Sequence, residues 1–122
     1  MNGNSPINAE VWQELLELEA STEPGMLNEM ITTYLNETGK ALQLFPVFAK
    51  EKNEKALRST AHKLKSSSAS MGALILSQLL VELEKSDGLS QETINKLLAR
   101  TAEEYERVRV YFEAQVRTRA AA

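Results

Sequence analysis

The sequence predicts an all-α protein, an antiparallel up-down four-helix bundle preceded by a short additional N-terminal helix. Three observations lead to this prediction. Apolar residues recur at three- and four-residue steps through most of the chain, which is the period of an amphipathic helix. The 122 residues include only 5 Gly and 3 Pro, and this scarcity of helix breakers favours helices. The breaks between helical stretches are short, so successive helices are expected to lie antiparallel beside one another.

Composition limits the classes of function. A chain of 122 residues is expected to form one domain, residues 1–122, around a single core. A net charge of −3 argues against nucleic acid as a partner, because no basic surplus exists to neutralise phosphates. With no Cys and one His, we expect neither disulfides nor a metal site. No apolar run is long enough to cross a membrane and no signal peptide is evident, so we expect a cytoplasmic protein without a membrane partner.

The first helix is expected to be short. Residues 1–6 are polar and are expected to fray. Asn8 is a favourable N-cap for a helix from Ala9 to about Glu19. The apolar residues of this helix, which are expected to supply its contacts, are Val11, Trp12, Leu15, Leu16 and Leu18.

The second helix follows a break at residues 21–25, Ser-Thr-Glu-Pro-Gly, in which Thr22 is the expected cap. Its apolar stripe consists of Leu27, Met30, Ile31, Tyr34, Thr38, Leu42 and Phe45. Pro46 removes one backbone donor and clashes with the preceding turn. We therefore expect a kink or a restart at Pro46, with Val47 and Phe48 still packed.

The third helix carries the one histidine of the chain. Asn53 is its expected cap, and it runs to about Ser70. A core-facing stripe is formed by Leu57, Ala61, Leu64 and Ser68. His62 lies well over 100° from the centre of this stripe, so its imidazole is predicted on the solvent side. Gly72 is expected to supply the left-handed residue of the following turn.

Two more helices complete the bundle. The first runs from Leu74 to Lys85, with Ile75, Leu76, Leu79, Leu80 and Leu83 as its apolar residues. Residues 86–88, Ser-Asp-Gly, end it, and Ser90 is the expected cap of the last helix. The apolar stripe of the last helix is Ile94, Leu97, Leu98, Tyr105, Val108, Phe112 and Val116. A basic, alanine-rich tail at about residues 117–122 ends the chain.

Residues 62–73, His-Lys-Leu-Lys-Ser-Ser-Ser-Ala-Ser-Met-Gly-Ala, resemble the signature of histidine-containing phosphotransfer (HPt) domains. That signature is His, any residue, an apolar residue, Lys, Gly and several small residues, with a Gly ten places after the His. His62, Leu64, Lys65 and Gly72 match it in type and spacing. Ser66 stands where the family usually has Gly. The helix pattern before and after the motif also fits, so the resemblance extends over nearly the whole chain.

The chemistry of these residues suits a phosphoryl carrier. The pKa of an unperturbed imidazole is about 6.5, so neutral imidazole is a good nucleophile near pH 7. Lys65 lies one turn after His62 and could offset the charge of incoming phosphoryl oxygens. Ser66 and Ala69 are small and leave room for a partner to reach the ring.

The resemblance implies roles for further residues. In HPt domains the residue 22 places after the His accepts the ring Nδ1–H, and here this residue is Glu84, which would leave Nε2 as the phosphoacceptor. The family also implies a phosphorelay intermediate, in which a receiver-domain aspartate phosphorylates His62 and another receiver aspartate takes the phosphoryl group away. The expected partners are response-regulator receiver domains or a hybrid sensor kinase. Their expected docking surface comprises Arg58, Ser59, Lys63, Ser66 and Ala69. We expect a monomer without a bound cofactor, with Mg²⁺ on the receiver.

The residues of this motif also admit other interpretations. A lone helical His is most often an ordinary surface residue, and Lys65 and Glu84 could be solvated charges. In the dimerisation domains of autokinases an acidic residue normally follows the His, whereas Lys63 follows it here. No Gly-rich phosphate loop occurs, so we expect no ATP-dependent kinase activity and no conventional enzyme. The main alternative is a helical adaptor or a degenerate HPt domain that binds a partner without phosphotransfer.

Overall fold

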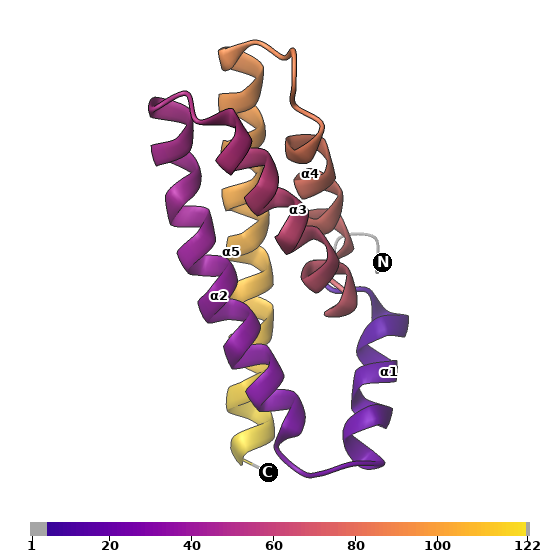
Figure 1. Ribbon diagram of the computed structural model, residues 1–122. Helices are drawn as coiled ribbons and strands as arrows, with labels where there is room; N and C mark the ends of the chain where they lie inside the picture. Colours follow the sequence, from indigo (N-terminus) through magenta and orange to yellow (C-terminus); the bar gives the residue numbers. More distant parts are fainter. Residues whose placement is uncertain (1–4, 122) are drawn as a thin grey trace.

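The computed structural model describes residues 5–121, and side chains as far as Arg119. Within that range it contains helices and no strand. The helices are α1 (Ala9–Ala20), α2 (Met26–Lys50), α3 (Glu54–Ser70), α4 (Leu74–Glu84) and α5 (Gln91–Ala121). The long helices α2 and α5 run side by side along the whole molecule, α3 and α4 cover one half of them, and α1 lies beside the other half (Figure 1). The predicted all-α bundle with a short N-terminal helix is confirmed.

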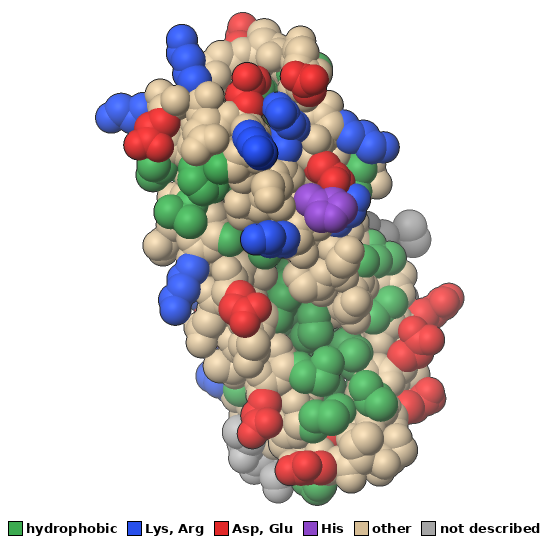
Figure 2. All heavy atoms as spheres, viewed as in Figure 1, with side chains coloured by type: hydrophobic (Ala, Val, Ile, Leu, Met, Phe, Trp, Pro, Cys, Tyr) green, Lys and Arg blue, Asp and Glu red, His purple; other side chains and the backbone are tan. Residues whose placement is uncertain are grey.

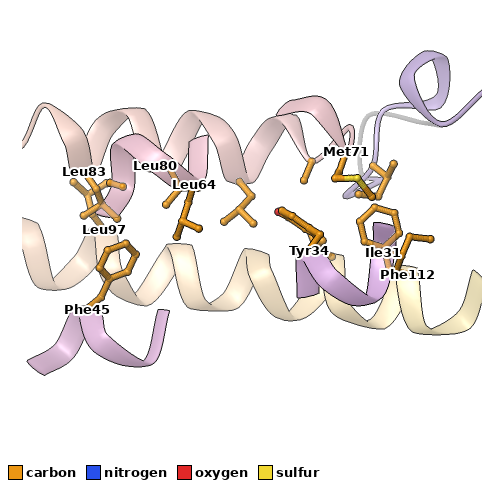
Figure 3. Packing of buried hydrophobic residues seen from close by; sticks show 14 of the residues in the cluster. Ile31, Tyr34, Phe45, Leu64, Met71, Leu80, Leu83, Leu97 and Phe112 are labelled. Atoms are coloured by element: carbon orange, nitrogen blue, oxygen red, sulfur yellow. The ribbon is translucent and has the colours of Figure 1, made fainter. Parts of the chain in front are cut away.

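The core is a continuous cluster of apolar side chains along the axis of the bundle. Figure 3 shows Phe45, Leu64, Leu80, Leu83 and Leu97 toward one end of it and Ile31, Tyr34, Met71 and Phe112 toward the other. The buried residues of α3 are the four that the sequence predicts: Leu57, Ala61, Leu64 and Ser68. The Ser68 hydroxyl is hydrogen-bonded to the Tyr34 hydroxyl at 2.7 Å. Burial raises the pKa of Tyr34 to about 12, so this buried pair stays neutral.

The start of α2 differs from the prediction, because Thr22 does not cap it. Gly25 occupies the N-cap with φ 88° and offers no side chain. The Thr22 hydroxyl instead donates to the Leu18 carbonyl oxygen at 2.8 Å, at the end of α1. The backbone N–H of Leu27, in the first turn of α2, donates to Glu19 Oε2 at 2.9 Å. A carboxylate from α1 thus caps α2, and Arg119 of α5 binds the other oxygen of Glu19.

Of the kink or restart expected at Pro46, the restart does not occur, because α2 continues through this residue to Lys50, and the kink stays a prediction. A proline inside a helix costs about 3 kcal/mol. Phe45, just before it, is buried, and Phe48, just after it, packs against the core. Burial on both sides of the proline holds the helix together. The prediction that Val47 packs in the bundle is wrong, since this residue is 44% exposed.

Further expectations concern two apolar side chains and the two ends of the chain. Leu18 and Ile75, which the sequence predicts to pack against other helices, are exposed. Residues 117–121 of the basic tail continue α5 as a helix. Of the expected frayed segment, residues 1–4 lie outside the described residues, as does residue 122 of the tail. In the part of the chain that the structure describes, no helix combines the length and the hydropathy needed to span a membrane.

The turn between α3 and α4 depends on Gly72, which has φ 85° as predicted. Its carbonyl oxygen accepts the backbone N–H of Asn8 at 2.8 Å. A Cβ at this position would lie 3.1 Å from both Ile7 Cγ2 and Val11 Cβ. The start of α1 therefore packs directly on the turn. Because the turn is only three residues long, α3 and α4 lie antiparallel in contact.

Gly72→Ala should destabilise the protein more than the matched change Gly88→Ala. Gly88 also has φ 85°, but nothing lies within 4 Å of the Cβ that an alanine would add. The left-handed backbone should cost each variant about 1–2 kcal/mol. The contacts with Ile7 and Val11 should cost Gly72→Ala roughly 1–3 kcal/mol more. Urea unfolding measures the two free energies, and an equal loss in both variants would contradict the packing of α1 on the turn.

Candidate functional site

The candidate site is centred on His62, on the outer face of α3. The buried stripe of α3 faces the core, and the His62 side chain on the other side of the helix is 64% exposed. Asn53 starts the helix as predicted, since its side chain accepts the backbone N–H of Ala56 at 3.2 Å. In Figure 2 the imidazole lies on the surface with Lys and Arg side chains around it, and hydrophobic side chains gather below it.

One nitrogen of the His62 ring is held by the neighbouring helix. His62 Nδ1 is hydrogen-bonded to Oε2 of Glu84, the last residue of α4. An ionised carboxylate only accepts hydrogen bonds, so Nδ1 carries the proton and donates it. No other described residue bonds the ring, which leaves Nε2 directed away from Glu84 and without a partner in the described residues. The pairing exists because the turn at Gly72 folds α4 back along α3.

Lys65 binds the second oxygen of the same carboxylate. Its Nζ lies 2.5 Å from Glu84 Oε1, and the Glu84 side chain is only 22% exposed. The hydrogen bond from Lys65, followed by that from His62, lowers the pKa of Glu84 below its ordinary range. Glu84 is therefore an ionised group shared by His62 and Lys65.

The sequence interpretation did not foresee the ion pair of Lys65 with Glu84. It assigned Lys65 to the charge of a phosphoryl group and connected Glu84 only with His62. A signal was present, because His62 and Lys65 lie on successive turns of one helix and both face α4 when the two helices are antiparallel. The contact of Lys65 with a phosphoryl group remains a prediction.

The other expected surface residues lie around His62 on α3. Ser59, Lys63 and Ser66 are exposed, while Arg58 and Ala69 are half-buried. Arg58 Nη1 is 3.9 Å from Oδ1 of Asp87, in the loop after α4. The structure brings these five residues together on the outer side of one helix, and their role in docking remains a prediction.

A groove of about 560 Å³ lies between α2 and α3, and the sequence interpretation did not single it out. Its apolar lining includes Met26, Met30, Tyr34, Leu64 and Met71. Among the described residues no group of three or more His, Cys, Asp or Glu side chains is arranged to hold a metal ion.

Comparisons with known proteins identify the family. The family model of the Hpt domain matches residues 25–111, which is more than half of the chain. The chain therefore belongs to the Hpt domain family, as the resemblance of residues 62–73 indicated. No match was found among curated proteins.

Two solved structures share the fold. One is histidine-containing phosphotransfer protein B from Pseudomonas aeruginosa PAO1, with a TM-score of 0.79, 22% identity and coverage of 95% of this chain and 98% of that chain. The other is a rice protein described as a candidate histidine-containing phosphotransfer protein, with a TM-score of 0.87, 19% identity and coverage of 99% of this chain and 86% of that chain. At these identities the two structures establish the likeness of the fold.

The Glu84 carboxyl should titrate below the ordinary glutamate pKa of about 4.3, mainly because of Lys65. A carboxyl whose pKa is lowered by folding stabilises the folded state at pH values above the unfolded pKa, and this contribution is lost as the pH falls through the folded pKa. The stabilisation should therefore be complete above about pH 5, decline as the pH falls below the unfolded pKa of about 4.3, and be lost once the pH is below the folded pKa. Carbon-detected NMR of the side-chain carboxyl measures the midpoint. Lys65→Met should raise it toward the ordinary value, and an unchanged midpoint would remove Lys65 as the main cause.

Proposed function

We propose that this chain is a phosphorelay intermediate that accepts a phosphoryl group on His62 Nε2 from the aspartate of a receiver domain and passes it to the aspartate of another receiver. The observation that carries the proposal is the arrangement of the exposed ring. Nδ1 is held by Glu84, while Nε2 has no described partner and the side chain is 64% exposed. A ring held in this way offers one nitrogen, in a fixed orientation, to an incoming phosphoryl group.

The transfer can be written with the residues of the site. The lone pair of Nε2 attacks the phosphorus of the aspartyl phosphate, the bond from phosphorus to the aspartate oxygen breaks, and the aspartate leaves as a carboxylate. The ring keeps its Nδ1 proton and becomes cationic when the new N–P bond forms. Glu84 is ionised beside that proton and offsets the new positive charge. Transfer to the second receiver reverses these steps and returns the ring to its neutral form.

In the same transfer step, Lys65 would offset the negative charge of the phosphoryl group. Its ammonium is half-buried and bound to Glu84, one turn from His62 along α3. The phosphoryl group brings negative charge to a position close to this cation, which can then contact both the phosphoryl oxygens and Glu84. In the proposed role the receivers supply the Mg²⁺, and the chain needs no nucleotide and no kinase activity of its own.

The alternative is an adaptor that binds a receiver without accepting phosphate. The pairing of Nδ1 with Glu84 favours the carrier, because an adaptor needs no oriented imidazole. The deciding experiment is incubation with a phosphorylated receiver domain, followed by a search for acid-labile phosphate on the chain and mapping of the modified residue.

His62→Gln should abolish this phosphorylation and leave the fold intact, because the side chain lies on the outer face of α3. Radiolabelled transfer from a phosphorylated receiver measures the uptake, and circular dichroism measures the helical content. Wild-type protein that stays unlabelled with a panel of receivers would favour the adaptor. Phosphate on the His62→Gln variant would place the acceptor at another residue.

Ser66 tests whether the partner approaches over the His62 face. Ser66 is exposed and lies one turn beyond His62. Ser66→Leu should fold normally but transfer about tenfold more slowly or worse, because the larger side chain blocks close approach to the ring. Ser66→Gly is the matched control and should transfer at the wild-type rate or slightly faster, despite a helix cost of about 0.5 kcal/mol. Wild-type rates for Ser66→Leu would mean that receivers dock elsewhere.

A further inference from the structure

The candidate site depends on how α4 is rotated relative to α3. His62 and Lys65 belong to α3, whereas the carboxylate that they share belongs to α4. Side-chain atoms lie about 5–6 Å from the axis of a helix, so a rotation of α4 by about 10° would move the Glu84 carboxylate by about 1 Å. Displacements of about 1 Å are large enough to slow a positioned reaction about 100-fold. Some contact must therefore fix this rotation.

Apolar packing limits this rotation but defines it only loosely. Leu76, Leu80 and Leu83 hold α4 against the core and are fully buried. Contacts of this kind are non-directional, and their free energy depends mainly on the area buried. A small rotation would leave most of that area buried while it moved Glu84 away from His62.

A hydrogen bond from Ser77 is directional and can hold α4 in one rotation about its axis relative to α3. Ser77 Oγ donates to the backbone carbonyl oxygen of Lys65 at 2.8 Å, from the first turn of α4 across to α3. Ser77 lies seven residues before Glu84, which is two turns, so both side chains leave α4 on the same face. In the described part of the chain, the other side-chain hydrogen bonds between α3 and α4 are the two that Glu84 itself makes.

We propose that Ser77 is a positioning residue for the His62 site. Its hydroxyl sets the rotation of α4 against the backbone of Lys65, so that the Glu84 carboxylate reaches His62 Nδ1 and Lys65 Nζ together. Ser77 contacts neither the ring nor the incoming group and acts through Glu84. The consequence for transfer rests on the proposed function, whereas the consequence for the ring proton does not.

The hydrogen bond of Ser77 is expected to contribute little to the free energy of unfolding. The carbonyl oxygen of Lys65 keeps its ordinary helical donor, the N–H four residues later, when the hydroxyl is removed. No buried polar group is then left without a partner, and the Ser77 side chain is only half-buried. A loss of orientation without a large loss of stability is therefore the signature of the positioning role.

The test compares Ser77→Ala with two controls. Ser77→Thr keeps the hydroxyl and should behave as wild type. Ser67→Ala removes a serine hydroxyl whose bond, 3.1 Å to the Leu64 carbonyl oxygen, stays within α3, so it should leave the site unchanged. Nitrogen-15 NMR of the His62 ring in alkaline solution, where imidazole is neutral, measures the fraction of protons on Nδ1. Ser77→Ala should lower this fraction and slow receiver-dependent phosphorylation by about threefold to thirtyfold.

The remaining outcomes contradict either the positioning role of Ser77 or the proposed function. An unchanged ring-proton fraction in Ser77→Ala overturns the positioning role. So does an equal effect of Ser77→Thr, or a large drop in the thermal midpoint, since side-chain volume or stability would then explain the change. Wild-type protein that takes no phosphate contradicts the proposed function alone, because the ring measurement on the unphosphorylated protein still decides the role of Ser77.

Discussion

The carboxylate of Glu84 is the group on which the candidate site depends. One oxygen accepts the proton of His62 Nδ1, and the other binds Lys65 Nζ. Neither contact could form if α4 did not return along α3 after the short turn at Gly72. The turn in turn requires a residue without a side chain, because of its positive φ and because Ile7 and Val11 pack against it. The chemistry of the surface is thus connected, through one turn, to the packing of α1.

The fold could be predicted from the sequence because the apolar period is strong and long. The α3 stripe illustrates this, since its four predicted positions are its four buried residues. The errors occurred where a local rule competed with a distant contact. Thr22 has the side chain of a good N-cap, but Glu19 reaches the start of α2 from another helix. Pro46 breaks helices locally, yet burial of Phe45 keeps α2 continuous.

The site could be predicted in part, and its two halves have different origins. The exposure of His62 follows from the helical period, which places it opposite the core. Its partner Glu84 came from the resemblance to a family, since no local pattern connects residues 22 positions apart. The bond from Lys65 to the same carboxylate, and that from Ser77 to the Lys65 backbone, require the rotation of two helices about their axes. That rotation depends on contacts between the two helices, the Ser77 hydrogen bond among them, and is not encoded in the period of either helix.

The nitrogen of His62 that no described residue binds would, under the proposed function, have a consequence for the order of events in signalling. Under the proposed function, the hydrogen bond from Nδ1 to α4 favours one orientation of the ring, so every donor and every acceptor would approach the same atom from the same side. A donor receiver still seated on α3 would exclude the next one. Under the proposed function, two receivers therefore bind one after the other. The first must dissociate from the phosphorylated chain before the phosphoryl group can be transferred to the second. Flux through such a relay is limited by how quickly partners leave as much as by how quickly they bind.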